Sequence, residues 1–137
     1  MRLMKLVLVA LMLLFPQQVP NPKNDPTGVW QATTGSEFQI QLSGSDMHVS
    51  MVPGTNPKFL QYEMELKNEK EVNTYYGKGF FIAKMETGKE CKLTTDWRVV
   101  VVSPERIIGT VTSVTADGKT CEIQETTQVP IDLKKKK

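Results

Sequence analysis

Few side chains in this chain have the chemistry that catalysis requires. His48, the single histidine, lies between Met47 and Val49 in a stretch that alternates apolar and polar residues, with no nucleophile beside it. Glu63 and Glu65 could act as a pair of acid and base carboxylates, but they alternate with apolar residues, as on the solvent face of a strand. We therefore expect that the protein is not an enzyme.

The two cysteines, Cys91 and Cys121, could form a disulfide, a metal site or a reactive thiol. A zinc site would need further Cys or His ligands at short spacing, and the chain has no Cys-x-x-Cys motif. In an exported protein an even pair favours a disulfide, which would stabilise the fold by about 3 to 4 kcal/mol in the chain-entropy model. We expect a bridge between Cys91 and Cys121, and neither a metal nor a cofactor.

Residues 1–20 have the pattern of a secretory signal peptide. Arg2 and Lys5 precede an apolar run over residues 6–15, which is shorter than the ~20 residues that span a bilayer. We therefore expect a secreted or periplasmic protein without stable membrane insertion once the signal is removed. Residues 21–27 are expected to form an extended, proline-containing lead-in.

The charge of the chain argues against nucleic acid as a partner. Lys and Arg number 17 against 15 Asp and Glu. Six of the cations are Arg2, Lys5 and Lys134 to Lys137, the last four in a predicted lysine-rich tail over residues 132–137, so without these six the chain has 17 − 6 = 11 cations against 15 carboxylates. No basic nucleic-acid surface is expected on the rest of the chain. The lysine-rich tail is interpreted as a solubilising terminus, with contact to anionic surfaces as the alternative.

From Gly28 onward apolar residues recur at every second position, which is typical of strands with one buried face. Turn signals such as Ser43-Gly44-Ser45-Asp46 and Ala116-Asp117-Gly118-Lys119 separate these runs. The sequence thus predicts an all-β domain over residues 28–131, built as an eight-stranded antiparallel up-and-down β-barrel. The predicted strands cover residues 28–33, 38–42, 47–51, 60–66, 75–85, 91–102, 106–115 and 121–130.

This topology constrains the predicted disulfide. In a meander, the connections between the fifth and sixth strands and between the seventh and eighth lie at the same end, and each cysteine follows one of them. Strands two apart in a sheet are separated by about 9.5 Å, which is too far for a disulfide. We therefore expect the two connections to fold toward each other.

Several segments resemble the avidin and streptavidin family of biotin-binding barrels, which belongs to the calycins. Thr27-Gly28-Val29-Trp30 followed by Gly35-Ser36-Glu37-Phe38 is similar to the first hairpin of that family. Thr74-Tyr75-Tyr76-Gly77-Lys78 resembles its Thr-rich aromatic strand, and Thr95-Asp96-Trp97 its Thr-x-Trp strand. The matches span residues 27 to about 100, and they imply the barrel fold with a small ligand inside.

The resemblance also implies a ligand site. Ser36 corresponds to the hydroxyl that bonds the ureido oxygen of biotin, and Tyr75 and Trp97 correspond to aromatic walls of the pocket. Together with Phe38 and Leu66, these residues form the predicted wall of a cavity for an amphipathic or apolar molecule.

The chain departs from the avidin pattern at several of these positions. It has Ala32 where the family has an Asn, and Leu66 where the family has a pocket Trp. Glu69 and Glu71 stand in place of loop hydroxyls that hold the carboxylate of biotin, and they would repel an anion. Because each lost donor to a buried ligand lowers affinity, we do not expect strong biotin binding.

A weaker resemblance connects the chain to the lipocalins. Thr95-Asp96-Trp97 is similar to the Thr-Asp-Tyr motif of that family, and Arg106 stands where a later Arg is found. The subunit-bridging Trp of the avidins, expected near Ile107 or Ile108, is absent. Neither resemblance therefore predicts whether the chain forms a homo-oligomer, which stays a hypothesis.

Two functions remain open at this stage. The first is an exported barrel that holds a small amphipathic or apolar molecule in its interior. The alternative is a surface protein-recognition or structural barrel, with a filled interior and no small ligand. A cavity of about 300 Å³ or more, open at one end, would favour the first.

Overall fold

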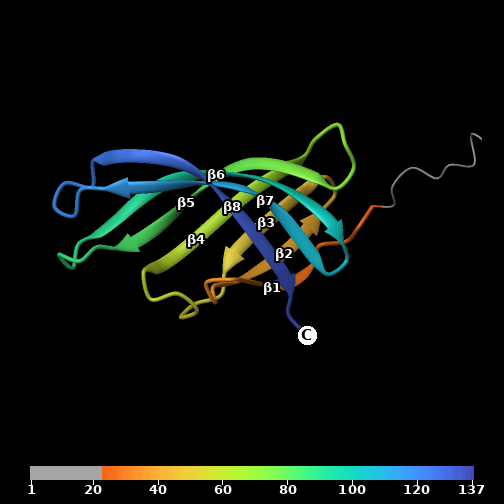
Figure 1. Ribbon diagram of the computed structural model, residues 1–137, viewed down its shortest axis with the longest axis horizontal. Helices are drawn as coiled ribbons and strands as arrows, with labels where there is room; N and C mark the ends of the chain where they lie inside the picture. The colour runs from red at the N-terminus through yellow and green to blue at the C-terminus, as the bar shows by residue number, and fades with distance from the viewer. Residues whose placement is uncertain (1–22) are drawn as a thin grey trace, which may run out of the picture.

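The computed structural model describes residues 23–137, which form a closed barrel of eight antiparallel strands in chain order (Figure 1). The predicted fold class, an all-β up-and-down β-barrel, is confirmed. The predicted signal segment, residues 1–20, lies outside the described residues. No helix suited to crossing a membrane occurs among residues 23–137. The strands are β1 (Gly28–Ala32), β2 (Glu37–Ser43), β3 (Asp46–Met51), β4 (Phe59–Asn68), β5 (Thr74–Lys84), β6 (Glu90–Ser103), β7 (Arg106–Ala116) and β8 (Ile123–Lys135).

The alternation of apolar residues places the core inside the barrel, as β6 illustrates. Along this strand every second side chain from Cys91 to Val101 is buried, including Leu93, Thr95 and Trp97, while the residues between them are more exposed. Successive side chains of a strand point to opposite faces. The inward set of β6 therefore packs against the inward sets of the other strands in one continuous core.

Two glycines of β5 allow β4 and β5 to approach closely. A Cβ atom on Gly77 would lie 1.9 Å from the carbonyl oxygen of Glu65, and one on Gly79 would lie 1.9 Å from that of Glu63. The register of the pair is regular here, so the two glycines permit a close approach of two backbones and do not mark a bulge.

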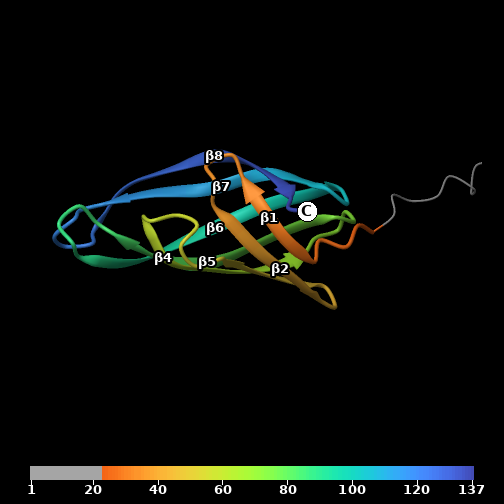
Figure 2. The same cartoon turned by 90° about the horizontal axis from the view of Figure 1, so that it is seen from below.

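The barrel is uneven in length. Strands β1 to β3 have 5 to 7 residues, whereas β4 to β8 have 10 to 14. The β6–β7 ladder begins at the Trp97–Val111 pair, so the tip of the β7–β8 hairpin separates from β6 beyond that point. Figures 1 and 2 show this hairpin and the β5–β6 hairpin projecting together past the short strands.

The lead-in, described from Lys23, covers one end of the barrel. The indole Nε1 of Trp30 donates a hydrogen bond to the carbonyl of Pro26 at 2.8 Å. Asn24 accounts for two more bonds, from its backbone N–H to Asn73 Oδ1 at 2.7 Å and from its side chain to the carbonyl of Val101 at 3.0 Å. Because Trp30 is fully buried beneath this segment, the end where β2–β3, β4–β5 and β6–β7 connect is closed.

The barrel continues past the predicted boundary at residue 131. Strand β8 runs to Lys135, and its residues Leu133 to Lys135 pair with Ala32 to Trp30 of β1, which closes the barrel. Residues 132–135 are therefore part of the last strand rather than of a lysine-rich tail. Lysine is infrequent in strands, but the ammonium of Lys135 lies 5.8 Å from the centre of the Trp30 ring, so its stem covers an aromatic side chain.

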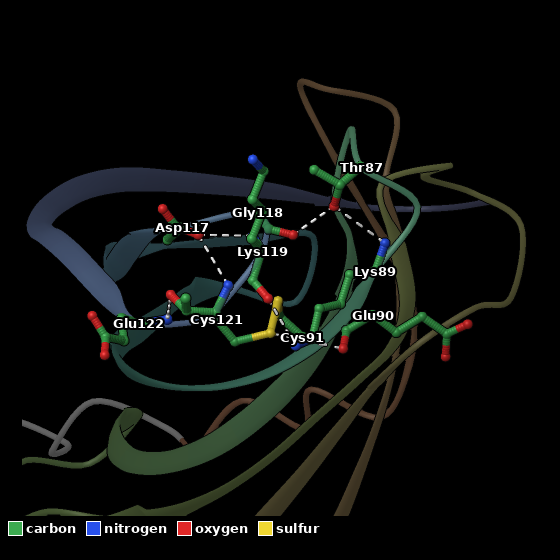
Figure 3. Close-up of a disulfide and its surroundings, with 10 residues drawn as sticks. Thr87, Lys89, Glu90, Cys91, Asp117, Gly118, Lys119, Cys121 and Glu122 are labelled. Atoms are coloured by element: carbon green, nitrogen blue, oxygen red, sulfur yellow. Dashed lines mark hydrogen bonds between the residues drawn. A yellow bond between two sulfur atoms is a disulfide. The ribbon is translucent and has the colours of Figure 1, made fainter.

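The predicted disulfide is confirmed. Cys91 at the start of β6 is bonded to Cys121 in the β7–β8 connection, with the Cα atoms 5.5 Å apart (Figure 3). The two connections fold toward each other, as expected from the topology. Lys89 Nζ donates to the carbonyl of Lys119 at 2.8 Å, and the Thr87 hydroxyl donates to the carbonyl of Gly118.

Candidate functional site

The barrel contains a cavity of about 1090 Å³ at the end opposite the lead-in. Residues of all four connections at that end contribute to its lining, among them Thr34, Pro57, Glu86 and Gly118. Trp30, at the closed end, does not line it. The interior is thus divided along the barrel axis into a packed half and an open half.

Aromatic side chains form the floor and wall of the cavity. The rings of Phe38 and Trp97 meet edge to face with centroids 5.2 Å apart, while Tyr62 stacks on Phe81 at 5.4 Å. Phe59 packs against Phe81 edge to face at 5.2 Å. These contacts fix the rings by packing, and they leave an apolar surface facing the open space.

A hydrogen bond links two of the aromatic residues. Trp97 Nε1 donates to the hydroxyl oxygen of Tyr62 at 2.9 Å, and both side chains are buried. Burial of the Tyr62 hydroxyl raises its pKa above the ordinary tyrosine value, and the bond from Trp97 offsets part of that rise. Tyr62 is therefore a neutral phenol at physiological pH, held in place by the indole.

Replacing Tyr62 with phenylalanine should change how stability depends on pH. In the unfolded chain tyrosine ionises near pH 10, so the raised pKa in the fold gives a stabilisation that is complete below pH ~10 and is lost as the pH rises through the folded-state value. We expect Tyr62→Phe to cost about 1 to 3 kcal/mol at pH 7, because the indole N–H loses its acceptor, yet to lose less stability than the wild type above pH ~10. Urea unfolding from pH 7 to above pH ~10 checks the prediction. It would be contradicted if the free energies of unfolding of the two proteins changed with pH in parallel.

The polar part of the cavity is centred on Ser36. Its hydroxyl oxygen accepts hydrogen bonds from Asn56 Nδ2 at 2.9 Å and from the Thr34 hydroxyl at 3.3 Å. Asn56 is oriented in turn, because its Oδ1 accepts from the backbone N–H of Lys58 at 3.0 Å. The Ser36 hydroxyl hydrogen is not used in either bond, so it can be donated to an acceptor in the cavity.

The structure brings three of the five predicted wall residues together. Ser36, Phe38 and Trp97 line the cavity, whereas Leu66 and Tyr75 do not. Both of these are fully buried in the packed half of the barrel, where Leu66 pairs with Met47 and with Gly77. Burial and the nearby Asp25 carboxylate raise the pKa of Tyr75, whose hydroxyl has no hydrogen-bond partner within residues 23–137.

The sequence interpretation missed Tyr62, Phe81 and Asn56 as site residues. Tyr62 and Phe81 have the inward phase of their strands, and they lie toward the connections at the open end. The sequence contains both of these features, so these two residues could have been predicted to line the cavity. Asn56 lies in the β3–β4 connection, where residues do not alternate between two faces, so the sequence does not indicate which way its side chain points.

Glu69 and Glu71 lie away from the cavity. They belong to the β4–β5 connection at the closed end, and Glu69 forms an ion pair with Arg98 on the surface. The expectation that these carboxylates repel an anionic ligand is therefore wrong, because they are not among the residues that line the cavity. Ala32, in contrast, does line it.

The side chains considered for catalysis meet on the outer surface. His48 Nε2 lies 3.0 Å from Glu63 Oε2, and His48 Nδ1 contacts Glu65. All three come from the exposed faces of β3 and β4, outside the cavity lining. Within residues 23–137 no group of His, Cys, Asp and Glu side chains is arranged to hold a metal ion.

The fold and the cavity define a class of protein, a closed eight-stranded antiparallel barrel compatible with calycin-like architecture. Comparison gives no match to any protein family, curated protein or solved structure. Function is therefore argued from the cavity itself.

Proposed function

We propose that this protein is an exported barrel that binds one small apolar or amphipathic molecule in its cavity. The observation that carries the proposal is the cavity of about 1090 Å³, open at one end and lined mainly by apolar and aromatic side chains. Binding pockets for small molecules typically measure about 300 to 1,000 Å³ and have this composition. A barrel that served only as a rigid module would gain stability by filling such a space.

The lining indicates the chemistry of the ligand. The rings of Phe38, Phe81 and Trp97 would cover an apolar body, and the Ser36 hydroxyl would donate to a carbonyl or hydroxyl oxygen. Charged side chains of both signs, Lys84 and Asp132 among them, also contribute to the lining. This mixture favours a neutral molecule with one polar group over a strongly charged one.

We further propose an avidin-like relationship without strong biotin binding. Ser36 and Trp97, two of the positions on which the resemblance depends, line the cavity. Ala32 and Leu66 supply none of the polar or aromatic groups that the avidins have there, and Leu66 lies outside the cavity. Missing donors and rings each lower affinity. A biotin-like ligand would accordingly bind weakly.

Export is supported by the disulfide between Cys91 and Cys121. Disulfides persist in oxidising compartments such as the periplasm and the extracellular space. This agrees with the signal-like pattern of residues 1–20.

The alternative function, a recognition or structural module without a small ligand, draws support from the packed half of the barrel. Leu66, Tyr75 and Met64 are fully buried in that half. The two functions differ in whether the open half of the barrel binds a ligand. A test therefore has to fill the cavity in that half and leave the packed half unchanged.

Filling the cavity with a larger side chain tests the proposal. Val111 lines the cavity on β7, and its neighbour Thr110 is exposed on the opposite face of the same strand. We expect Val111→Trp to weaken binding of the uncharged fluorescent probe N-phenyl-1-naphthylamine about tenfold or more, a difference of about 1.4 kcal/mol. Thr110→Trp, the matched control, should bind the probe like the wild type.

Two outcomes would contradict the cavity function. The first is a wild-type protein that fails to bind the probe while it is folded by circular dichroism. The second is probe binding that Val111→Trp and Thr110→Trp affect equally, which would place the probe on the surface. Native mass spectrometry of the purified protein then identifies any molecule that copurifies.

A further inference from the structure

The outer part of the β7–β8 hairpin, residues 112–128, has no fully buried side chain. In β8 the six residues from Ile123 to Gln128 are all exposed, so neither face of the strand packs on the core there. In β6, by contrast, every second residue from Cys91 to Val101 is buried. A two-stranded hairpin without a packed face is only marginally stable in water. The position of this outer hairpin therefore depends on a few attachments to the rest of the barrel (Figures 1 and 2).

The attachments of the outer hairpin all lie on its β7 side. Among the described residues, every hydrogen bond that joins it to another element runs to β6 or to the β5–β6 connection. At its base, the Thr95 hydroxyl donates to the carbonyl of Thr112 at 2.7 Å, and the Thr112 hydroxyl donates to the Asp96 carboxylate. At its tip, the disulfide and the bonds from Thr87 and Lys89 complete the attachment (Figure 3).

The β8 side of the outer hairpin is an unpaired edge. In the described part of the chain, β8 pairs with β1 only through its last three residues. The N–H of Lys136 donates to the carbonyl of Val29 in β1, so even-numbered residues of β8 face this edge. Pro130 has that phase and no N–H, which hinders pairing by a further strand. The edge continues through residues 129–132, which line the cavity, so it forms a border of the cavity.

The outer hairpin covers one side of the cavity. Residues 112–116 and Gly118 contribute to the lining. Because β1 follows β8 around the closed barrel, the next lining residues past the unpaired edge are Thr33 and Thr34 of the β1–β2 connection. Within the described residues, no hydrogen bond joins the outer hairpin to that connection. Movement of the outer hairpin away from the β1–β2 connection would therefore widen the entrance without breaking a strand pair.

We propose that the outer hairpin is a lid that opens along its β8 edge to admit and release the ligand, and that Asp96 is the positioning residue that holds it closed. This inference rests on the proposed binding function. Asp96 does not line the cavity. Its carboxylate accepts from Tyr76 at 3.3 Å and from the Thr112 hydroxyl, which in turn accepts from Gln128 Nε2 at 2.8 Å. These bonds extend the restraint from β6 across β7 to β8. Lids are drawn from the least stable parts of a fold.

Hydrogen exchange without any ligand tests whether the lid opens. We expect amides bonded within the outer hairpin to exchange faster than those of the β4–β5 ladder. Asp96→Ala should speed exchange of the outer hairpin by about threefold to tenfold, as the loss of one hydrogen bond allows, and leave the β4–β5 ladder unchanged. Asp96→Asn is the matched control, because it removes the same charge but keeps an oxygen acceptor for Thr112, and it should exchange as the wild type does. An outer hairpin that exchanges as slowly as the β4–β5 ladder overturns the proposal, and so does equal exchange in the two variants.

Probe kinetics test whether this opening controls access to the cavity. In stopped-flow mixing with N-phenyl-1-naphthylamine, Asp96→Ala should raise the association and dissociation rates by a similar factor, because a lid gates entry and exit alike. Thr94→Ala, at an exposed position of the same phase on β6, should leave both rates unchanged. Unchanged rates in Asp96→Ala would overturn the lid. A folded wild type that binds no probe would instead contradict the proposed function, and the two failures are distinguishable because exchange is measured without the probe.

Discussion

Replacing Trp30 with alanine is expected to lower the free energy of unfolding by about 3 to 5 kcal/mol. Trp30 is one of the largest fully buried side chains, and its Nε1 donates to the carbonyl of Pro26. The substitution would leave a large void between the core and the lead-in, and it would leave that carbonyl without its partner. Urea unfolding followed by circular dichroism measures the loss.

A conservative variant separates the two contributions of Trp30. Trp30→Phe keeps most of the ring volume and removes only the N–H, so it should cost about 1 to 3 kcal/mol. Since Trp30 does not line the cavity, folded Trp30→Phe should bind the probe with near wild-type affinity. Equal losses for the alanine and phenylalanine variants would show that the indole contributes through its hydrogen bond rather than through packing.

The strands could be predicted from the sequence because one face of each is buried. Along β6 the alternation from Cys91 to Val101 repeats without interruption, and it gives both the element and its inward side chains. The turn signals between the strands are equally local. Barrel closure could be predicted from eight consecutive strands joined by short connections, and the position of the disulfide followed from the order of those connections.

Position along the barrel axis could not be predicted from alternation. Tyr75 and Trp97 have the same inward phase, yet Tyr75 is in the packed half and Trp97 lines the cavity. The two residues differ in their distance from the end of the barrel that the lead-in covers. The lead-in is held at that end by hydrogen bonds from Asn24 to Asn73 and to Val101. Such contacts join residues far apart in the chain, so no local pattern encodes them.

The C-terminal boundary shows a second limit of sequence reasoning. Lys134 and Lys135 have low strand propensity, and their composition resembles a solvated tail. Pairing with Gln31 and Trp30 nevertheless makes them the residues that close the barrel. Tertiary pairing decides the state of this segment, because the edge of β1 would otherwise lack a partner.

Removing the disulfide is the second change with a large expected effect. The double variant Cys91→Ala/Cys121→Ala should lose about 3 to 4 kcal/mol of stability, because a sequence separation of 30 residues sets the entropy that the bridge removes from the unfolded chain. The bridge also spans the gap where β6 and β7 have separated, beyond the Trp97–Val111 pair. Chemical denaturation of both proteins under identical conditions gives the difference.

The position of the disulfide implies an effect on the cavity in addition to stability. Without it, the tip of the β7–β8 hairpin is held to the β5–β6 connection mainly by the bonds from Lys89 to Lys119 and from Thr87 to Gly118, which are exposed. Because Gly118 lines the cavity, the freed tip should let a bound probe leave faster, which stopped-flow dilution measures. Lys89→Met is the matched control, since it removes one exposed bond and keeps the bridge, and it should change stability by no more than about 0.5 kcal/mol. Unchanged probe release from the folded double variant would mean that the β7–β8 tip does not control access to the cavity.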